Sequence, residues 1–190
     1  MRKIKAFLMT TVDGYYEGES AWAIDFHNVD AEFNEFAVQQ LDAAEHLVFG
    51  RVTFQGMADY WPSEEAVKTD PEVASRMNSA AKIVVSRTLE ESDVTWANSR
   101  LMRDPEDLAA LRNEKTGKDL LVLGSSVLTT ALIEAGLLDE LRIMINPVLL
   151  GSGNSLSSSA GGRIALKLLR TREFGNGNVL LTYEPATIRR

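Results

Sequence analysis

Short apolar runs alternate with segments of helical periodicity through the first 136 residues of the chain. Each run has the length of a strand, and each ends in a glycine, a serine or a turn pair. This pattern is typical of buried strands connected by helices. It predicts four buried strands, at residues 3–12, 46–50, 81–88 and 119–124.

Segments with helical spacing separate these strands. After Asp30, apolar side chains recur on one helical face, at Phe33, Phe36, Ala37, Leu41 and Ala44. Residues 104–117 are predicted to form a helix, because they carry both a start and a stop signal. Pro105 follows the N-cap candidate Asp104, and Gly117 ends the segment. A further helix is expected at residues 126–136, where it stops at a glycine.

Strand patterns dominate the remainder of the chain. Residues 139–151, 164–174 and 178–185 are strand-like, and residues 175–177 join the last two as a hairpin turn. The sequence therefore predicts one α/β domain with a mainly parallel central sheet, helices on both faces and an antiparallel C-terminal hairpin. We assign residues 1–185 to this domain and residues 186–190 to a tail.

The composition narrows the class of protein. The chain has 190 residues, is 45% hydrophobic and contains no cysteine, which excludes disulfides and thiolate metal sites. His27 and His46 lack metal-ligand spacing, so no metal site is expected. No apolar run is long enough for a membrane span, and the N-terminal segment lacks the features of a signal peptide, so we expect a cytoplasmic protein without a membrane partner. A formal charge of −7 argues against a nucleic-acid partner.

Small and polar residues follow three of the predicted strands. These strand ends are Gly50-Arg51-Val52-Thr53, Ser86-Arg87-Thr88 and Gly124-Ser125-Ser126. Open α/β sheets bind ligands in the crevice at the carboxyl ends of their strands. If the strands are parallel, all three segments lie along that edge.

The third strand end is suited to an anion. Ser125 is an N-cap candidate, and the helix after it begins with backbone amides that lack intrahelical partners. Those amides and the helix dipole favour a negative charge, and Gly124 lets a diphosphate approach the backbone closely. The alternative is an ordinary turn at Gly124 followed by a serine that only caps a helix.

The arginines at the other two strand ends point to the same ligand class. Arg51 and Arg87 each follow a buried strand, and a guanidinium group presents a fork of donors that matches phosphate geometry. The hydroxyl of Thr53 lies in the first turn after Gly50, within reach of a diphosphate. Alternatively, both arginines are solvated ends of strands. Together with the helix start, they favour a site for an anionic nucleotide.

Four motifs then carry a resemblance to a known family. They are GRVTF, KIVVSRTL, LGSSVLTTALIEAGLLDEL and NPVLLGSG, and they occur in this order along almost the whole chain. The chain resembles the dihydrofolate-reductase-like superfamily, and more closely the riboflavin-biosynthesis reductase, or RibD C-terminal, domain. The resemblance implies an oxidoreductase of the 5-amino-6-(5-phosphoribosylamino)uracil reductase type, which transfers a hydride from NADPH to a pyrimidine- or pterin-like substrate. It also implies a possible homodimer.

The resemblance assigns the cofactor-binding residues. In such proteins the arginine of the GRxT motif binds the 2′-phosphate of NADPH, and its threonine lies near the pyrophosphate. The glycine-rich turn cradles the diphosphate, the SRT segment flanks the adenosine end, and a second glycine loop lies near the nicotinamide. The matching positions here are Gly50, Arg51, Thr53, Ser86, Arg87, Gly124, Ser125, Ser126, Gly151 and Gly153.

One of these positions departs from the family pattern. The family has two adjacent glycines at the diphosphate turn, and Ser125 replaces the second of them. If that position needs a positive φ, a Cβ costs about 1–2 kcal/mol and weakens binding roughly tenfold. Alternatively, the serine hydroxyl replaces a water molecule and binding survives.

The substrate end offers two carboxylates. Dihydrofolate reductases hold the pterin with an acid on the first helix, and Asp30 falls at about that place, with Glu32 as the fallback. Asp13 matches an aspartate that riboflavin reductases keep after their first strand, so Asp30 and Asp13 are the catalytic candidates. The alternatives are a helix N-cap for Asp30 and a turn residue for Asp13.

Two other functions stay open. The fold can serve as a nucleotide-binding module without turnover, which the serine at the diphosphate turn favours. It can also be a divergent dihydrofolate reductase. The arginine that binds the folate tail is absent in this case, since Ala80 and Ala81 occupy its place.

Overall fold

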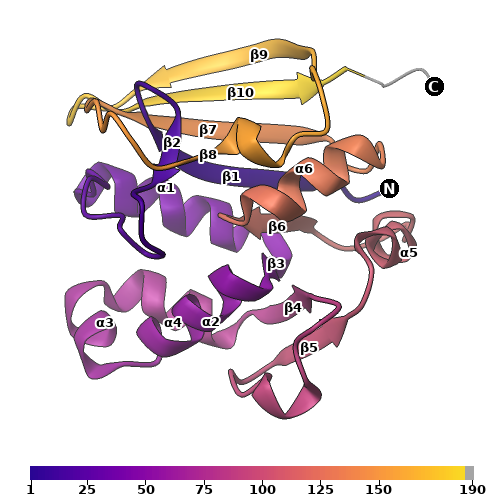
Figure 1. The fold of residues 1–190 in the computed structure, drawn as a ribbon. Helices are drawn as coiled ribbons and strands as arrows, with labels where there is room; N and C mark the ends of the chain where they lie inside the picture. Colours follow the sequence, from indigo (N-terminus) through magenta and orange to yellow (C-terminus); the bar gives the residue numbers. More distant parts are fainter. Residues whose placement is uncertain (187–190) are drawn as a thin grey trace.

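An eight-stranded sheet runs through the middle of the molecule in the computed structural model, which describes residues 1–186 (Figure 1). Its strand order is β5-β4-β3-β6-β1-β7-β10-β9, and β2 and β8 form a separate small sheet. The strands are β1 (Ile4–Thr11), β2 (Tyr15–Glu17), β3 (Ala44–Gly50), β4 (Ala81–Val85), β5 (Ser99–Met102), β6 (Asp119–Leu123), β7 (Glu140–Asn146), β8 (Asn154–Ser155), β9 (Leu166–Glu173) and β10 (Val179–Pro185).

Within residues 1–186, six helices connect these strands, together with three short 3₁₀ turns. The helices are α1 (Ala31–Asp42), α2 (Arg51–Tyr60), α3 (Glu64–Thr69), α4 (Pro71–Ser79), α5 (Leu108–Arg112) and α6 (Ser126–Glu134). The 3₁₀ turns are η1 (Glu91–Asp93), η2 (Pro105–Asp107) and η3 (Leu156–Ser159). Among the described residues, no helix is both long and apolar enough to cross a bilayer.

Strand directions confirm the fold class. The five pairings among β5, β4, β3, β6, β1 and β7 are all parallel, whereas β10 pairs antiparallel with both β7 and β9. The sheet is therefore mainly parallel and ends in an antiparallel C-terminal hairpin. The predicted domain, residues 1–185, lies within the described part of the chain, whereas residues 187–190 of the predicted tail lie outside it.

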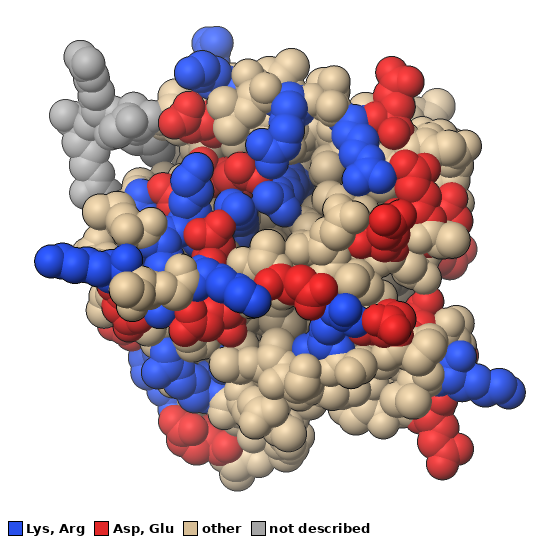
Figure 2. Space-filling view, turned by 180° about the vertical axis from the view of Figure 1, so that it is seen from behind, with Lys and Arg blue, Asp and Glu red and all other residues tan. Residues whose placement is uncertain are grey.

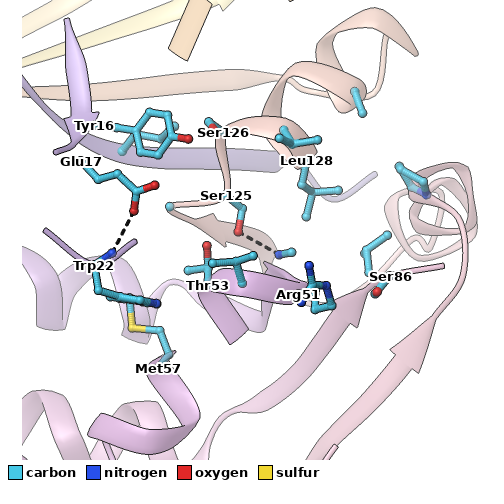
Figure 3. Close-up of a pocket in the computed structure, with 18 of the residues that line it drawn as sticks. Tyr16, Glu17, Trp22, Arg51, Thr53, Met57, Ser86, Ser125, Ser126 and Leu128 are labelled. Carbon is cyan, nitrogen blue, oxygen red and sulfur yellow. Dashed lines mark hydrogen bonds between the residues drawn. The ribbon is translucent and has the colours of Figure 1, made fainter. Parts of the chain in front are cut away.

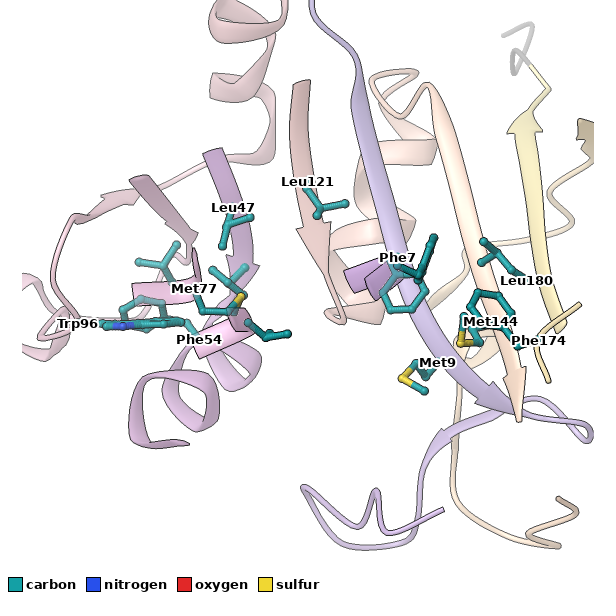
Figure 4. Close-up of a cluster of buried hydrophobic side chains, with 14 of the residues drawn as sticks. Phe7, Met9, Leu47, Phe54, Met77, Trp96, Leu121, Met144, Phe174 and Leu180 are labelled. Carbon is teal, nitrogen blue, oxygen red and sulfur yellow. The ribbon is translucent and has the colours of Figure 1, made fainter. Parts of the chain in front are cut away.

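Side chains that alternate along β1 supply two separate cores. Ile4, Ala6 and Leu8 pack on the face of the sheet that α5 and α6 cover, and Phe7 and Met9 pack on the opposite face. Successive residues of a strand point to opposite sides, so a central strand that is apolar throughout serves both layers. Figure 4 shows the second cluster, in which aromatic and methionine side chains lie between the sheet and its helices. The prediction of helices on both faces is confirmed.

The segment 104–117 differs from its prediction. The structure has a 3₁₀ turn, Pro105–Asp107, and then a helix of only five residues, Leu108–Arg112. Gly117 does not end this helix; it lies in the turn before β6 with φ +113°, and a Cβ there would lie against Arg2 and Glu45. The polar run between Arg112 and Gly117 offers no apolar side chain to bury, so the helix ends early.

Candidate active site

A cleft with a volume of about 620 Å³ opens at the carboxyl ends of the parallel strands. Segments that follow β3, β4 and β6 meet there, as parallel strands require. The prediction that the three strand ends share one groove is therefore confirmed. The sequence-predicted residues that line the cleft are Gly50, Arg51, Thr53, Ser86, Arg87, Gly124, Ser125 and Ser126.

The corner between β6 and α6 has an unusual backbone. Gly124 and Ser125 have φ values of +58° and +55°, so two successive residues are left-handed. Ser125 occupies the N-cap position, but its side chain does not cap the helix. Its Oγ instead accepts a hydrogen bond of 2.8 Å from the backbone N–H of Gly50 and ties the end of β6 to the end of β3 (Figure 3). The expectation of a serine cap was therefore wrong.

The start of α6 consequently stays open toward the cleft. Within the described residues, the N–H groups of Ser126 and Val127 donate to no acceptor. Both residues line the cleft, and so does Thr53 from α2. A Cβ at Gly124 would lie 3.2 Å from Thr53 Cγ2, so the bare glycine lets the threonine reach the corner. Free amides, the helix dipole and a hydroxyl form a donor set for an anion.

The two arginines differ in how far their donors are occupied. Arg51 begins α2 and makes one long hydrogen bond, 3.3 Å from its Nη1 to Gln55 Oε1. Arg87 is 75% exposed and donates to Asp104 Oδ1 at 2.7 Å. Both guanidinium groups lie at the cleft, but that of Arg87 already has a carboxylate partner.

The hydroxyl of Ser86 serves the fold. It accepts hydrogen bonds from the backbone N–H groups of Thr88 and Leu89 and so closes the turn after β4. Arg103, which the sequence interpretation missed, also lines the cleft and donates to the carbonyl groups of Ser86 and Leu89. Ser86 therefore borders the cleft as a turn residue.

The other end of the cleft is lined by residues that are not among the predicted site residues. They are Tyr16, Glu17, Trp22, Ile24, His27 and Met57 (Figure 3). The Oε2 atom of Glu17 accepts from the Trp22 N–H at 3.1 Å, and its Oε1 atom accepts from Asn154 at 3.0 Å. Trp22 has φ +66° and lies directly on Gly56, where a Cβ would come within 2.0 Å of its ring. The signal that pointed to this region was its irregular, aromatic-rich pattern at residues 18–29.

His27 is a partly buried titratable group at this end of the cleft. Its Nε2 atom is buried and has no hydrogen-bond partner among the described residues. Burial lowers the pKa of His27 to about 4. The imidazole is therefore uncharged at neutral pH, and it lines the cleft as a neutral polar group.

The carboxylates expected at the substrate end form structural hydrogen bonds elsewhere in the fold. Asp30 Oδ1 accepts from the Phe33 N–H at 2.8 Å and caps α1, which is the alternative stated for it. Glu32 binds the Gly175 N–H and Arg172. Neither carboxylate is among the residues that line the cleft, where Glu17 supplies one instead.

Asp13 holds two loops together. Its carboxylate accepts from the Thr11 hydroxyl and from the N–H groups of Leu150 and Gly151, and these bonds, that of Thr11 first, lower the pKa of Asp13 to about 2. Gly151 thus contacts Asp13, and a Cβ at Gly153 would lie 2.4 Å from the carbonyl oxygen of Glu17. None of the three lines the cleft, but they hold the 150–153 loop against the start and end of β2, the strand that ends at Glu17.

The hydrogen-bond donors around the cleft suit the phosphate groups of a dinucleotide. Two guanidinium groups, the amides at the start of α6 and one hydroxyl surround part of the cleft, and aliphatic side chains of α6 supply flat contact surface. This matches a ligand that carries several phosphates and an aromatic base.

The chain is similar to one known protein in sequence and to several reductases in fold. The chain is 33% identical over 187 residues to YyaP of Bacillus subtilis (strain 168), an uncharacterized protein, and the match covers 96% of this chain and 94% of YyaP. The fold is similar to a deaminase/5-amino-6-(5-phosphoribosylamino)uracil reductase from Thermotoga maritima, with a TM-score of 0.67, 14% identity and coverage of 97% of this chain and 57% of that one. It is also similar to dihydrofolate reductase from Enterococcus faecalis in complex with NADP(H), with a TM-score of 0.60, 16% identity and 96% coverage of both chains.

A family model connects the fold with the motifs. The model of the RibD C-terminal domain matches residues 2–180, a range that contains every residue of the cleft. The chain belongs to the RibD C-terminal domain family.

Proposed function

We propose that the protein is an NADPH-dependent reductase that transfers a hydride to a pyrimidine- or pterin-like ring. The observation that carries the proposal is the gathering of Arg51, Arg87 and the open start of α6 around one cleft. Membership of the RibD C-terminal domain family and the likeness to a uracil-type reductase and to an NADP(H)-bound dihydrofolate reductase support it.

The strand-end residues would bind the phosphates of the cofactor. Arg51 has no carboxylate partner among the described residues and would be the donor for the 2′-phosphate. The N–H groups of Ser126 and Val127, with the Thr53 hydroxyl, would hold the diphosphate at the positive end of α6. Arg87 would either leave its partner Asp104 to bind the adenosine end of NADPH or contact Asp104 and the cofactor together. The bound NADPH supplies the hydride.

The acceptor ring would bind against Tyr16, Trp22 and Met57, which exclude water and present flat apolar surface. Glu17 is the carboxylate in this part of the cleft, and we propose that it accepts a hydrogen bond from an N–H edge of the ring. His27 lines the same part as an uncharged imidazole. The protein thus contributes orientation and a dry site.

Turnover tests the assignment of the acid. With NADPH and an aminopyrimidine ribosyl phosphate as acceptor, Glu17→Gln should lower kcat/KM at least tenfold, whereas Asp30→Asn should retain it within about threefold, provided the protein remains folded. Dihydrofolate as acceptor should be reduced more slowly, since the tail-binding arginine is absent at Ala80 and Ala81. NADPH binding without any turnover would instead identify a nucleotide-binding module, and loss of activity only in Asp30→Asn would contradict the role of Glu17.

A further inference from the structure

A second concavity lies on the other side of the sheet from α6, between α1 and the C-terminal strands. Its volume is about 310 Å³, and we call it the hairpin groove. Its walls come from α1, β7, β9 and β10, and it shares no lining residue with the cleft. Figure 2 shows this rear face, where basic side chains gather in the upper half of the view, over the C-terminal strands, with acidic ones between them.

The strand register brings three arginines into the hairpin groove. Thr182 of β10 pairs with Arg142 of β7 on one side and with Arg170 of β9 on the other. Arg172 follows two residues later on the same face, opposite Leu180. Residues directly opposite one another share a face of the sheet, and all three arginines line the groove. Like charges this close require a counter-charge.

The carboxylates present neutralise only part of this charge. Glu140 Oε1 accepts from Arg142 at 2.6 Å and from Arg170 at 2.9 Å, while Arg172 pairs with Glu32 at 2.9 Å. Two acids thus face three arginines. Among the described residues, Nε and Nη1 of both Arg170 and Arg172 have no acceptor. The groove carries a local positive charge on a chain whose formal charge is −7.

A buried hydroxyl at the floor of the groove also lacks a partner. Thr182 is 1% exposed, and its Oγ1 atom makes no hydrogen bond in the described part of the chain. Buried polar groups are normally hydrogen-bonded, so an unpaired hydroxyl among free guanidinium donors points to a missing acceptor. Gln40, also buried, holds Arg142 from the α1 side at 2.9 Å. Arg172 is fixed by stacking 4.2 Å above the ring of Phe174.

We propose that the hairpin groove binds the phosphate group of a small molecule. A tetrahedral dianion accepts hydrogen bonds from several directions at once, as donors from β7, β9 and β10 require, whereas a planar carboxylate matches a single fork. The groove is larger than a free phosphate ion and leaves room for the organic part of a phosphate ester. This proposal does not depend on the proposed reductase activity.

Nuclear magnetic resonance of the ¹⁵N-labelled full chain tests the site, with inorganic phosphate and glycerol 3-phosphate as probes at low ionic strength. Either probe should shift the amide signals of β9 and β10 around Thr182, and the organic phosphate should bind more tightly. Shifts confined to the start of α6, or no shift with either probe, would overturn the proposal.

Amino-acid substitutions test which side chains of the hairpin groove donate hydrogen bonds to the phosphate. Arg170→Gln should weaken phosphate binding at the hairpin groove at least tenfold, and Thr182→Val several-fold. Lys167→Gln, which removes an exposed charge from the same strand outside the groove, should leave it within twofold. Arg51→Ala, which alters the cleft, should also leave it unchanged. Equal weakening by Lys167→Gln and Arg170→Gln would mean that the probe senses only the general charge, and the proposal fails.

Discussion

Ser125 shows how one residue can be strained and bonded at the same time. It adopts φ +55°, a conformation that costs an L-residue about 1–2 kcal/mol, and its hydroxyl accepts from the Gly50 N–H. A hydrogen bond of this kind contributes about 1 kcal/mol. The serine thus offsets its own strain and joins two strand ends below the cleft.

The first prediction compares two substitutions at this position. Ser125→Ala keeps the strain and loses the bond, so it should destabilise the protein by about 1–2 kcal/mol, whereas Ser125→Gly also removes the strain and should stay within about 1 kcal/mol of the parent. Urea unfolding measures both. An alanine variant that is more stable than the glycine variant would refute the left-handed conformation.

His27 makes stability depend on pH. Burial lowers its pKa in the folded protein to about 4, below its ordinary value of 6.5, so the unfolded chain binds the proton more readily. Stability is therefore lost as pH falls from about 6.5 to about 4, with about 2 kcal/mol lost between pH 7 and pH 5 from this group. In His27→Gln, the loss over that interval should be smaller by about this amount. Equal pH dependence in both proteins, measured by urea unfolding, would show that the imidazole is not buried in solution.

At the scale of elements, residues 18–29 form the loop that carries the substrate end of the cleft. Asn146 holds it in place: its Oδ1 accepts from the Asn28 N–H at 2.9 Å, and its Nδ2 donates to the Thr10 carbonyl at 3.0 Å. The side chain is fully buried. Asn146 therefore connects the loop to the end of β1, while Asn176 and Asn178 hold Asn28 from the C-terminal hairpin.

Replacing the Asn146 amide should loosen the loop. Asn146→Leu has a similar volume but removes the acceptor of the part-buried Asn28 N–H and a donor to the buried Thr10 carbonyl, which should cost about 3 kcal/mol. Limited proteolysis should then cut within residues 18–29 faster than in the parent. Asn113→Leu, at an exposed position, serves as the control. Unchanged cleavage in Asn146→Leu would show that other contacts hold the loop.

The sequence predicted the secondary-structure elements and the strand ends at the cleft better than it predicted which contacts individual side chains make. Apolar runs and glycine stops located the strands and the three segments at the cleft, because parallel topology forces their ends to one edge. It offered the N-cap of α1 as the alternative for Asp30, because a cap is a local contact, but it did not reveal that Asp104 pairs with Arg87, which depends on packing between separate segments. Glu17 escaped notice because the short strand that ends at it leads into an irregular segment with no periodicity to interpret.

At the scale of the whole molecule, β9 forms an open edge of the sheet. All eight of its residues are exposed, and Leu166, Leu168 and Leu169 are 39%, 52% and 44% exposed. An edge strand presents unpaired backbone N–H and C=O groups, and the three exposed leucines add apolar contact surface beside the charged residues of β9, so the strand offers a template for pairing with another chain. We therefore propose that the expected homodimer forms through β9 of two copies.

Light scattering after size-exclusion chromatography tests this pairing. The parent should elute as a dimer, and the triple substitution of Leu166, Leu168 and Leu169 by serine should give a monomer with unchanged far-ultraviolet circular dichroism. A matched triple serine variant at Val52, Val67 and Val127, which are exposed elsewhere, should remain dimeric. A parent that is monomeric at all concentrations would rule out the β9 pairing.

The central claim is that the cleft binds NADPH through the 2′-phosphate and Arg51. Tryptophan fluorescence reports this directly, because Trp22 lines the cleft. NADPH should bind with a Kd on the order of micromolar and NADH at least tenfold more weakly. Arg51→Ala should weaken NADPH at least tenfold and leave NADH nearly unchanged, since NADH lacks that phosphate, while the exposed Arg100→Ala outside the cleft should change neither. Equal affinity of the parent for NADPH and NADH, or equal weakening of both by Arg51→Ala, would contradict the account.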